Sequence, residues 1–101
     1  MAKSEKENSS KPYRIFATDV FYEDLEELGE RAAAQITKKL QEYVYPQLRE
    51  QPYFGTNIKK LRDYQPETLR YRIGDFRVFY QIDDDERTVI LISANDRKDS
   101  Y

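Results

Sequence analysis

The sequence predicts an α+β domain of order β-α-α-β-β-β, in which a two-helix hairpin packs on a mostly antiparallel four-stranded sheet. Two segments with helical spacing of apolar residues follow one strand-like segment. Three further strand-like segments then follow, joined by turns too short to contain a helix. The chain has 101 residues, of which 39% are hydrophobic, so it is long enough for one small domain and too short for two.

The first eleven residues differ in composition from the rest. Residues 1–11 contain no apolar residue beyond Met1 and Ala2 and are rich in Ser, Lys and Glu. Such a segment cannot bury enough surface to offset the entropy lost on ordering. We therefore expect a disordered tail at 1–11 and a folded domain at 12–101.

The folded domain is expected to begin with a strand and a helix. Residues 13–18 are aromatic and β-branched, which favours a strand. Thr18 or Asp19 can cap the following helix, and Gly29 ends it. The apolar residues between them recur at helical spacing and are Phe21, Leu25 and Leu28.

A longer helix is expected over residues 30–50. Its apolar stripe consists of Ala33, Ile36, Leu40, Tyr43 or Val44, and Leu48. Pro46 removes an internal hydrogen bond, so it should kink this helix or split off its last turn. A turn at 51–55 and a polar connection at 57–66 follow.

Three consecutive strands are expected at 69–73, 76–82 and 88–94. The segments between them, 74–75 and 83–87, have the composition of hairpin turns. Because no helix separates these strands, they should form antiparallel neighbours.

Composition excludes several kinds of chemistry. The chain has neither cysteine nor histidine, so it has no disulfide, no thiolate metal site and no Ser-His-Asp arrangement. No apolar run is long enough to span a membrane, and none follows the N-terminal charges as in a secretory signal. We therefore expect a cytoplasmic protein that has no membrane partner and is not a zinc enzyme. The acidic hairpin tip at 83–86 is expected to be solvated, because it lacks the spacing of a calcium loop.

Charge is unevenly distributed along the chain. The net charge is −2, which alone argues against a nucleic-acid binder. However, residues 19–30 hold six acids and no base, whereas residues 57–82 hold six bases and three acids. An acidic protein can therefore still present a basic face.

Strand alternation predicts where these bases lie. Leu69, Tyr71 and Ile73 share one face, and Arg70 and Arg72 share the other. On the next strand the polar face carries Arg77, Phe79 and Gln81. If the apolar faces lie under the helices, the three arginines converge on the helix-free face, where guanidinium groups bind phosphate. The simpler interpretation is a charged face that keeps the sheet soluble.

These residues also carry a resemblance to a known family. The stretch 69–82, LRYRIGDFRVFYQI, precedes an acidic hairpin, an apolar strand and the ending RKDSY at 97–101. This pattern resembles the RelE/ParE superfamily of bacterial and archaeal toxins, and the RelE branch more closely. The likeness covers roughly residues 13–101, including the NIKKL segment at 57–61.

The resemblance implies a toxin of a type II toxin-antitoxin system. Such a toxin enters the ribosomal A site and cleaves mRNA there without metal, and an antitoxin from the same operon silences it. The implied partners are therefore the ribosome, mRNA and a cognate antitoxin.

The resemblance also assigns roles to individual residues. The family's functional basic pair falls on Arg70 and Arg72, and the arginine after the Gly-Asp-aromatic turn falls on Arg77. The implied catalytic set is Arg72, Arg77, Arg97 and Tyr101. In this mechanism the mRNA 2′-hydroxyl attacks the adjacent phosphate, and Arg72 and Arg77 stabilise the transition state. Arg97 acts as phosphate clamp or acid, and Tyr101 stacks on the cleaved nucleotide or takes part in proton transfer. The implied RNA-binding set is Lys59, Lys60, Arg62, Arg70 and Lys98.

Two other functions remain open from the sequence. One is the ParE-like role of inhibiting DNA gyrase, which requires no nuclease site. The other is a toxin fold with degraded chemistry that serves as an antitoxin-binding regulatory module. The net charge and Asp96, where many relatives have histidine, favour the latter, whereas the arginines and Tyr101 favour the nuclease.

Overall fold

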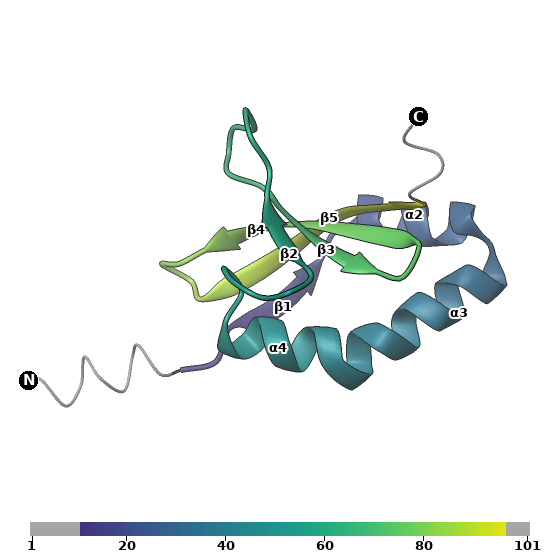
Figure 1. The fold of residues 1–101 in the computed structure, drawn as a ribbon, viewed down its shortest axis with the longest axis horizontal. Coiled ribbons are helices and arrows are strands. Elements are labelled where there is room, and N and C mark those ends of the chain that lie inside the picture. The colour runs from purple at the N-terminus through teal and green to yellow at the C-terminus, as the bar shows by residue number, and fades with distance from the viewer. Residues whose placement is uncertain (1–10, 97–101) are drawn as a thin grey trace, which may run out of the picture.

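The computed structural model describes residues 11–96, which form a five-stranded sheet covered on one face by helices (Figure 1). The elements are β1 (Arg14–Ala17), α2 (Asp19–Leu28), α3 (Glu30–Lys39), the π-helical segment η1 (Leu40–Val44), α4 (Tyr45–Glu50), β2 (Ile58–Lys60), β3 (Leu69–Ile73), β4 (Phe76–Asp83) and β5 (Thr88–Asp96). The strand order is β1-β5-β4-β3-β2. Only the β1–β5 pair is parallel, so the predicted α+β class with a mostly antiparallel sheet is confirmed.

The prediction of four strands was wrong, because the expected polar connection at 57–66 contains β2. This strand has only three residues and pairs antiparallel with β3 at the edge of the sheet. Its sequence is one isoleucine followed by two lysines, which has no strand-like alternation. Backbone pairing with β3, rather than side-chain pattern, therefore makes it a strand.

Both ends of α2 follow from the sequence as expected. The Thr18 hydroxyl accepts a hydrogen bond from the backbone N–H of Phe21 at 3.2 Å, which caps the first turn. At the other end Gly29 has φ 99° and ψ 157°, a backbone conformation that is essentially restricted to glycine. The chain then turns directly into α3.

The second helical segment is continuous but changes its winding before Pro46. Ile36, Leu40, Val44 and Leu48 are at most 2% exposed and recur every four residues. In a pure α-helix this spacing rotates the stripe by about 40° per step, because four residues turn through about 400°. The wider turn of η1, in which the N–H of Tyr45 bonds to the carbonyl of Leu40, offsets this rotation. It ends at Val44, two residues before Pro46, which lies in the first turn of α4.

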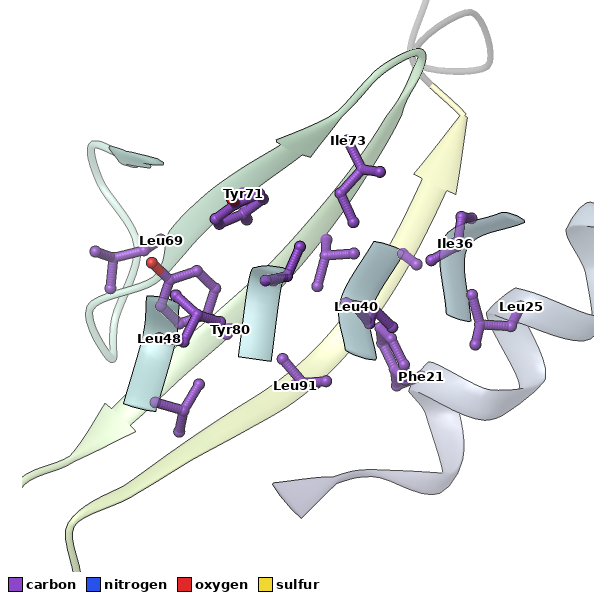
Figure 2. Packing of buried hydrophobic residues seen from close by; sticks show 14 of the residues in the cluster. Phe21, Leu25, Ile36, Leu40, Leu48, Leu69, Tyr71, Ile73, Tyr80 and Leu91 are labelled. Atoms are coloured by element: carbon purple, nitrogen blue, oxygen red, sulfur yellow. The ribbon is translucent and has the colours of Figure 1, made fainter. Parts of the chain in front are cut away.

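The hydrophobic core lies between the helices and one face of the sheet. Figure 2 shows Phe21, Ile36 and Leu40 packed toward the strand residues Ile73 and Leu91. Two buried tyrosines from the strands extend this layer, and each hydroxyl finds an acceptor on the helix side. Tyr71 donates to Gln47 Oε1 and Tyr80 to the carbonyl of Pro52, each at 2.6 Å. The opposite face of β3, β4 and β5 carries no helix in the described part of the chain.

Several predictions concern residues beyond this structure. The tail predicted at 1–11 lies outside the described residues except for Lys11, and so do Arg97, Lys98 and Tyr101. Between residues 11 and 96, no helix is both long and apolar enough to cross a membrane.

Candidate functional site

The β3–β4 hairpin determines which side chains meet on the helix-free face. Its two-residue turn, in which Gly74 has φ 58°, places Ile73 opposite Phe76. Two residues further from the turn the pair Tyr71–Val78 is buried under the helices. Because side chains alternate along a strand, the intervening pair, Arg72 and Arg77, projects from the other face. Arg70 lies on this face as well, opposite Phe79.

Arg72 and Arg77 lie in a row that crosses three strands. Asn95 of β5 is in register with Arg77, and its Oδ1 accepts a hydrogen bond from Arg77 Nε at 3.2 Å. Arg72 is exposed, and its Nε donates to the carbonyl of Gly74 at 3.3 Å. Neighbouring strands lie about 4.8 Å apart, so this row places two guanidinium groups within reach of one phosphate. We call Arg72, Arg77 and Asn95 the arginine row.

No carboxylate of the described chain neutralises the arginine row. The ion pairs recorded among residues 11–96 are Arg14–Glu86 and Lys60–Glu67, and neither involves Arg72 or Arg77. Like charges placed directly opposite each other on a sheet are destabilising. The pair therefore attracts an anion rather than stabilising the fold.

The other predicted RNA-binding residues do not all join this face. Lys59 is in register with Arg70, so it extends the basic face to β2. Lys60 is in register with the buried Leu69, so it points to the opposite side of the sheet. Its Nζ lies 2.6 Å from Glu67 Oε2. Arg62 is exposed on the loop after β2.

A small concavity lies beside the arginine row. It has a volume of about 210 Å³ and is lined by Tyr64, Thr68, Phe79, Ile92, Ser93 and Asn95. The chain between β2 and β3, which carries Tyr64, projects beyond the sheet (Figure 1). A β-bulge shapes the floor, because Ser93 is opposite Phe79 and Leu91 opposite Tyr80, which leaves Ile92 as the extra residue.

Four lining residues carry no predicted role from the sequence, namely Tyr64, Ile92, Ser93 and Asn95. The predicted last strand ended at Ala94, whereas β5 continues to Asp96 and brings Asn95 beside Arg77. Extending the regular hairpin register would have placed Ala94 opposite Arg77, because the β-bulge shifts the pairing by one residue and only this shift brings Asn95 there. The bulge at Ile92 has no sequence signal, because it inserts one residue into an otherwise regular apolar strand.

The acidic hairpin tip is more ordered than a solvated charge cluster. Asp84 Oδ1 accepts a hydrogen bond from the Tyr13 hydroxyl at 2.7 Å, and Oδ2 accepts one from the Tyr53 hydroxyl. These bonds, first that of Tyr53 and then that of Tyr13, hold the pKa of Asp84 below its ordinary value. The Arg87 guanidinium lies over the Tyr13 ring, 4.1 Å from its centroid. Within residues 11–96, no three acidic side chains are grouped as metal ligands.

Comparison with known families gives a match over most of the chain. The model of the family described as the ParE toxin of the type II toxin-antitoxin system parDE matches residues 15–101. No curated protein sequence matches the chain.

Solved structures share the fold over most of their length. The RelBE2 toxin-antitoxin complex from Mycobacterium tuberculosis contains a chain with 28% identity and a TM-score of 0.68, with 86% of this chain and 93% of that chain covered. For the intact RelBE complex of E. coli the identity is 26% and the TM-score 0.60, with coverages of 83% and 95%. The archaeal RelE-RelB complex from Pyrococcus horikoshii has 18% identity, a TM-score of 0.63 and coverages of 85% and 96%, which shows likeness of fold alone.

Proposed function

Since the chain belongs to the RelE/ParE superfamily of type II toxin-antitoxin toxins, we propose that it is a ribosome-dependent endoribonuclease that cleaves mRNA in the A site. The observation that carries this proposal is the placement of Arg72 opposite Arg77 with no carboxylate of the described chain neutralising them. Guanidinium groups bind phosphate oxygens bidentately, so this pair suits an RNA backbone.

The proposed reaction is a transesterification within the message. The 2′-oxygen forms a bond to the adjacent phosphorus, the bond from phosphorus to the 5′-oxygen breaks, and the 2′-hydroxyl proton leaves as the 5′-oxygen gains one. The products are a 2′,3′-cyclic phosphate and a 5′-hydroxyl end. Negative charge builds up on the phosphate oxygens along this path, and Arg72 and Arg77 stabilise it there.

The remaining roles belong to the same proposal. Arg97 serves as phosphate clamp or acid, and Tyr101 stacks on the cleaved nucleotide or takes part in proton transfer. Lys59 and Arg70 bind the RNA backbone on the face of the arginine row, while Lys60, Arg62 and Lys98 add contacts outside it. The reaction takes place in the cytoplasm on the ribosome, with no metal or other cofactor.

The partner that silences this activity is a cognate antitoxin. The similar solved structures include toxin-antitoxin complexes, which supports such a partner for this chain. We propose that the antitoxin, encoded in the same operon, covers the arginine row with an amphipathic helix or strand or displaces the C-terminal segment.

Inhibition of DNA gyrase is the second candidate function. It is favoured by one observation, namely that the matching family model is that of ParE toxins rather than of RelE toxins. This function requires a protein-binding surface and no cleavage chemistry.

One set of assays separates these functions. Purified protein is incubated with ribosomes programmed with an end-labelled message, with the same message free in solution, and with gyrase in a supercoiling assay. The proposal predicts cuts in the A-site codon, 2′,3′-cyclic phosphate ends, and much slower cleavage of the free message. Gyrase inhibition without cleavage would transfer the assignment to the second candidate, and inactivity in both assays would favour a degraded toxin.

A further inference from the structure

The concavity beside the arginine row is lined by aromatic, aliphatic and neutral polar side chains. It is lined by Tyr64, Thr68, Phe79, Ile92, Ser93 and Asn95, and none of these carries a charge at neutral pH. Its volume of about 210 Å³ exceeds the roughly 150 Å³ of an engineered apolar cavity that binds benzene. The concavity therefore suits a flat, neutral group of several atoms rather than an ion.

Two aromatic rings come from different elements. Phe79 lies on β4, in register between Arg70 and Ser93, and is half-buried. Tyr64 comes from the loop between β2 and β3, and 55% of its surface is exposed. The ring of an exposed tyrosine leaves apolar surface in contact with water. Stacking of this ring on a ligand removes that surface from water, which favours binding.

The charged groups lie next to the concavity rather than within it. Asn95 is both a lining residue and a member of the arginine row, because its Oδ1 accepts from Arg77 Nε. The Arg77 guanidinium carbon lies 5.8 Å from the centroid of the Phe79 ring. A ligand whose anionic part is bound by Arg72 and Arg77 thus has its adjoining part directed toward Phe79. A nucleotide has this combination of an anionic phosphate and a flat, neutral base.

We propose that this concavity binds a nucleobase of the RNA, stacked on Phe79 and Tyr64, while the neighbouring phosphate is held by Arg72 and Arg77. The inference rests on the proposed function and adds to it a base-binding subsite formed by Tyr64, Phe79 and Asn95. Stacking of a base on an aromatic side chain tolerates any base, because every base has a π-face. Ser93 and the Asn95 amide, which have hydrogen-bonding groups, would favour some bases over others.

The test compares ligands with and without a base. Binding of ribonucleoside 3′-monophosphates and of ribose phosphate is followed by NMR chemical-shift titration of the free protein, which requires neither ribosomes nor cleavage. The proposal predicts that the tightest-binding nucleotide exceeds ribose phosphate in affinity by about tenfold, consistent with one stacked base. Equal affinities for both ligands would overturn it.

Variants test whether the higher affinity for nucleotides comes from the concavity. Phe79→Leu keeps an apolar side chain on β4, and Tyr64→Leu alters an exposed loop, so neither should unfold the protein. Each should lower the affinity for the nucleotide much more than the affinity for ribose phosphate. The matched control is Phe54→Leu, a loop aromatic that is 75% exposed and does not line the concavity, and it should change neither. An advantage that persists in both Phe79→Leu and Tyr64→Leu would overturn the proposal.

The outcome is independent of the proposed nuclease activity. If the protein prefers nucleotides to ribose phosphate but does not cleave mRNA on programmed ribosomes, the base-binding subsite is supported and the proposed function is wrong. If the protein cleaves mRNA on the ribosome but shows no preference for nucleotides over ribose phosphate, the proposed function is supported and the proposed base-binding subsite is wrong.

Discussion

Arg72 and Arg77 lie directly opposite each other, which is unfavourable for the sheet and favourable for an anion. Elsewhere in the described chain, polar side chains serve the fold through specific hydrogen bonds. The hydroxyls of Tyr71 and Tyr80 reach acceptors on the helix side of the core, and Asp84 accepts from two tyrosines. At the scale of single residues, polar groups that are hydrogen-bonded within the fold therefore differ from the opposed arginine pair, which is suited to binding an anion.

The hydroxyl of Tyr80 is expected to stabilise the fold. The side chain is 0% exposed and donates to the carbonyl of Pro52, which is also buried. Tyr80→Phe leaves that carbonyl without this donor, so the free energy of unfolding should fall by about 1–3 kcal/mol. Urea denaturation measures it, with Tyr22→Phe, an exposed tyrosine, as a control expected to change stability by less than about 0.5 kcal/mol. Equal stabilities of the two variants would contradict the role of the Tyr80 bond.

Asp84 should make stability depend on acid pH. Its pKa is below the ordinary value of 3.8, chiefly because the hydroxyl of Tyr53 and then that of Tyr13 donate to its carboxylate. A carboxyl with a lowered pKa in the folded state stabilises the protein above its unfolded pKa and loses this contribution as pH falls through the folded pKa. Asp84→Asn should therefore be less stable than the wild type at pH 7, and the difference should shrink as pH falls below 3.8 and through the folded-state pKa of Asp84.

Thermal unfolding across this pH range provides the measurement for Asp84. Asp85→Asn at the same hairpin tip, which changes an exposed side chain, is the matched control, and at pH 7 it should be as stable as the wild type. A stability difference between Asp84→Asn and the wild type that stays constant from pH 7 to pH 2 would contradict the linkage.

At the scale of elements, the sequence predicts strand register only where a tight turn joins the two strands. The two-residue turn at Gly74 fixes the register of β3 against β4, so Arg72 and Arg77 could be placed opposite each other from the sequence. No tight turn connects β2 to β3, so neither the strand nor the direction of Lys60 could be predicted. The bulge at Ile92 and the approach of the Tyr64 loop depend on tertiary packing, which no local pattern contains.

The junction between α2 and α3 should tolerate only glycine. Gly29 has φ 99° and ψ 157°, and a Cβ built there meets no atom within 4 Å. Gly29→Ala should therefore destabilise the protein by about 1–3 kcal/mol through backbone strain alone. Urea denaturation is the measurement. The matched control is Ala34→Gly in the exposed interior of α3, whose expected cost is only about 0.5–1 kcal/mol. A Gly29→Ala protein as stable as the wild type would contradict this account of the junction.

At the scale of the whole molecule, charge is segregated by element. The acids at 19–30 lie on α2 and the start of α3, whereas the arginines lie on the helix-free face of the sheet. A net charge of −2 therefore coexists with a local basic surface. Under the proposed function, RNA and the antitoxin share this basic face.

Antitoxin binding should protect this face from solvent exchange. The protein is co-expressed with the product of the adjacent short reading frame, and amide hydrogen exchange is compared for free and bound toxin. We expect slower exchange in β3 and β4 of the complex, together with loss of cleavage. Unchanged exchange there in a complex that still cleaves would contradict a shared surface for antitoxin and RNA.

The most direct test of the proposed function compares two arginine variants on programmed ribosomes. Arg77→Ala removes one guanidinium from the arginine row, whereas Arg14→Ala removes an exposed arginine of β1. Single-turnover cleavage of A-site mRNA is measured for the wild type and both variants, with urea denaturation confirming that each is folded. We predict that Arg77→Ala cleaves about a hundredfold more slowly without loss of stability and that Arg14→Ala cleaves like the wild type. Equal cleavage rates for folded Arg77→Ala and Arg14→Ala would contradict the assignment of the arginine row as the catalytic site.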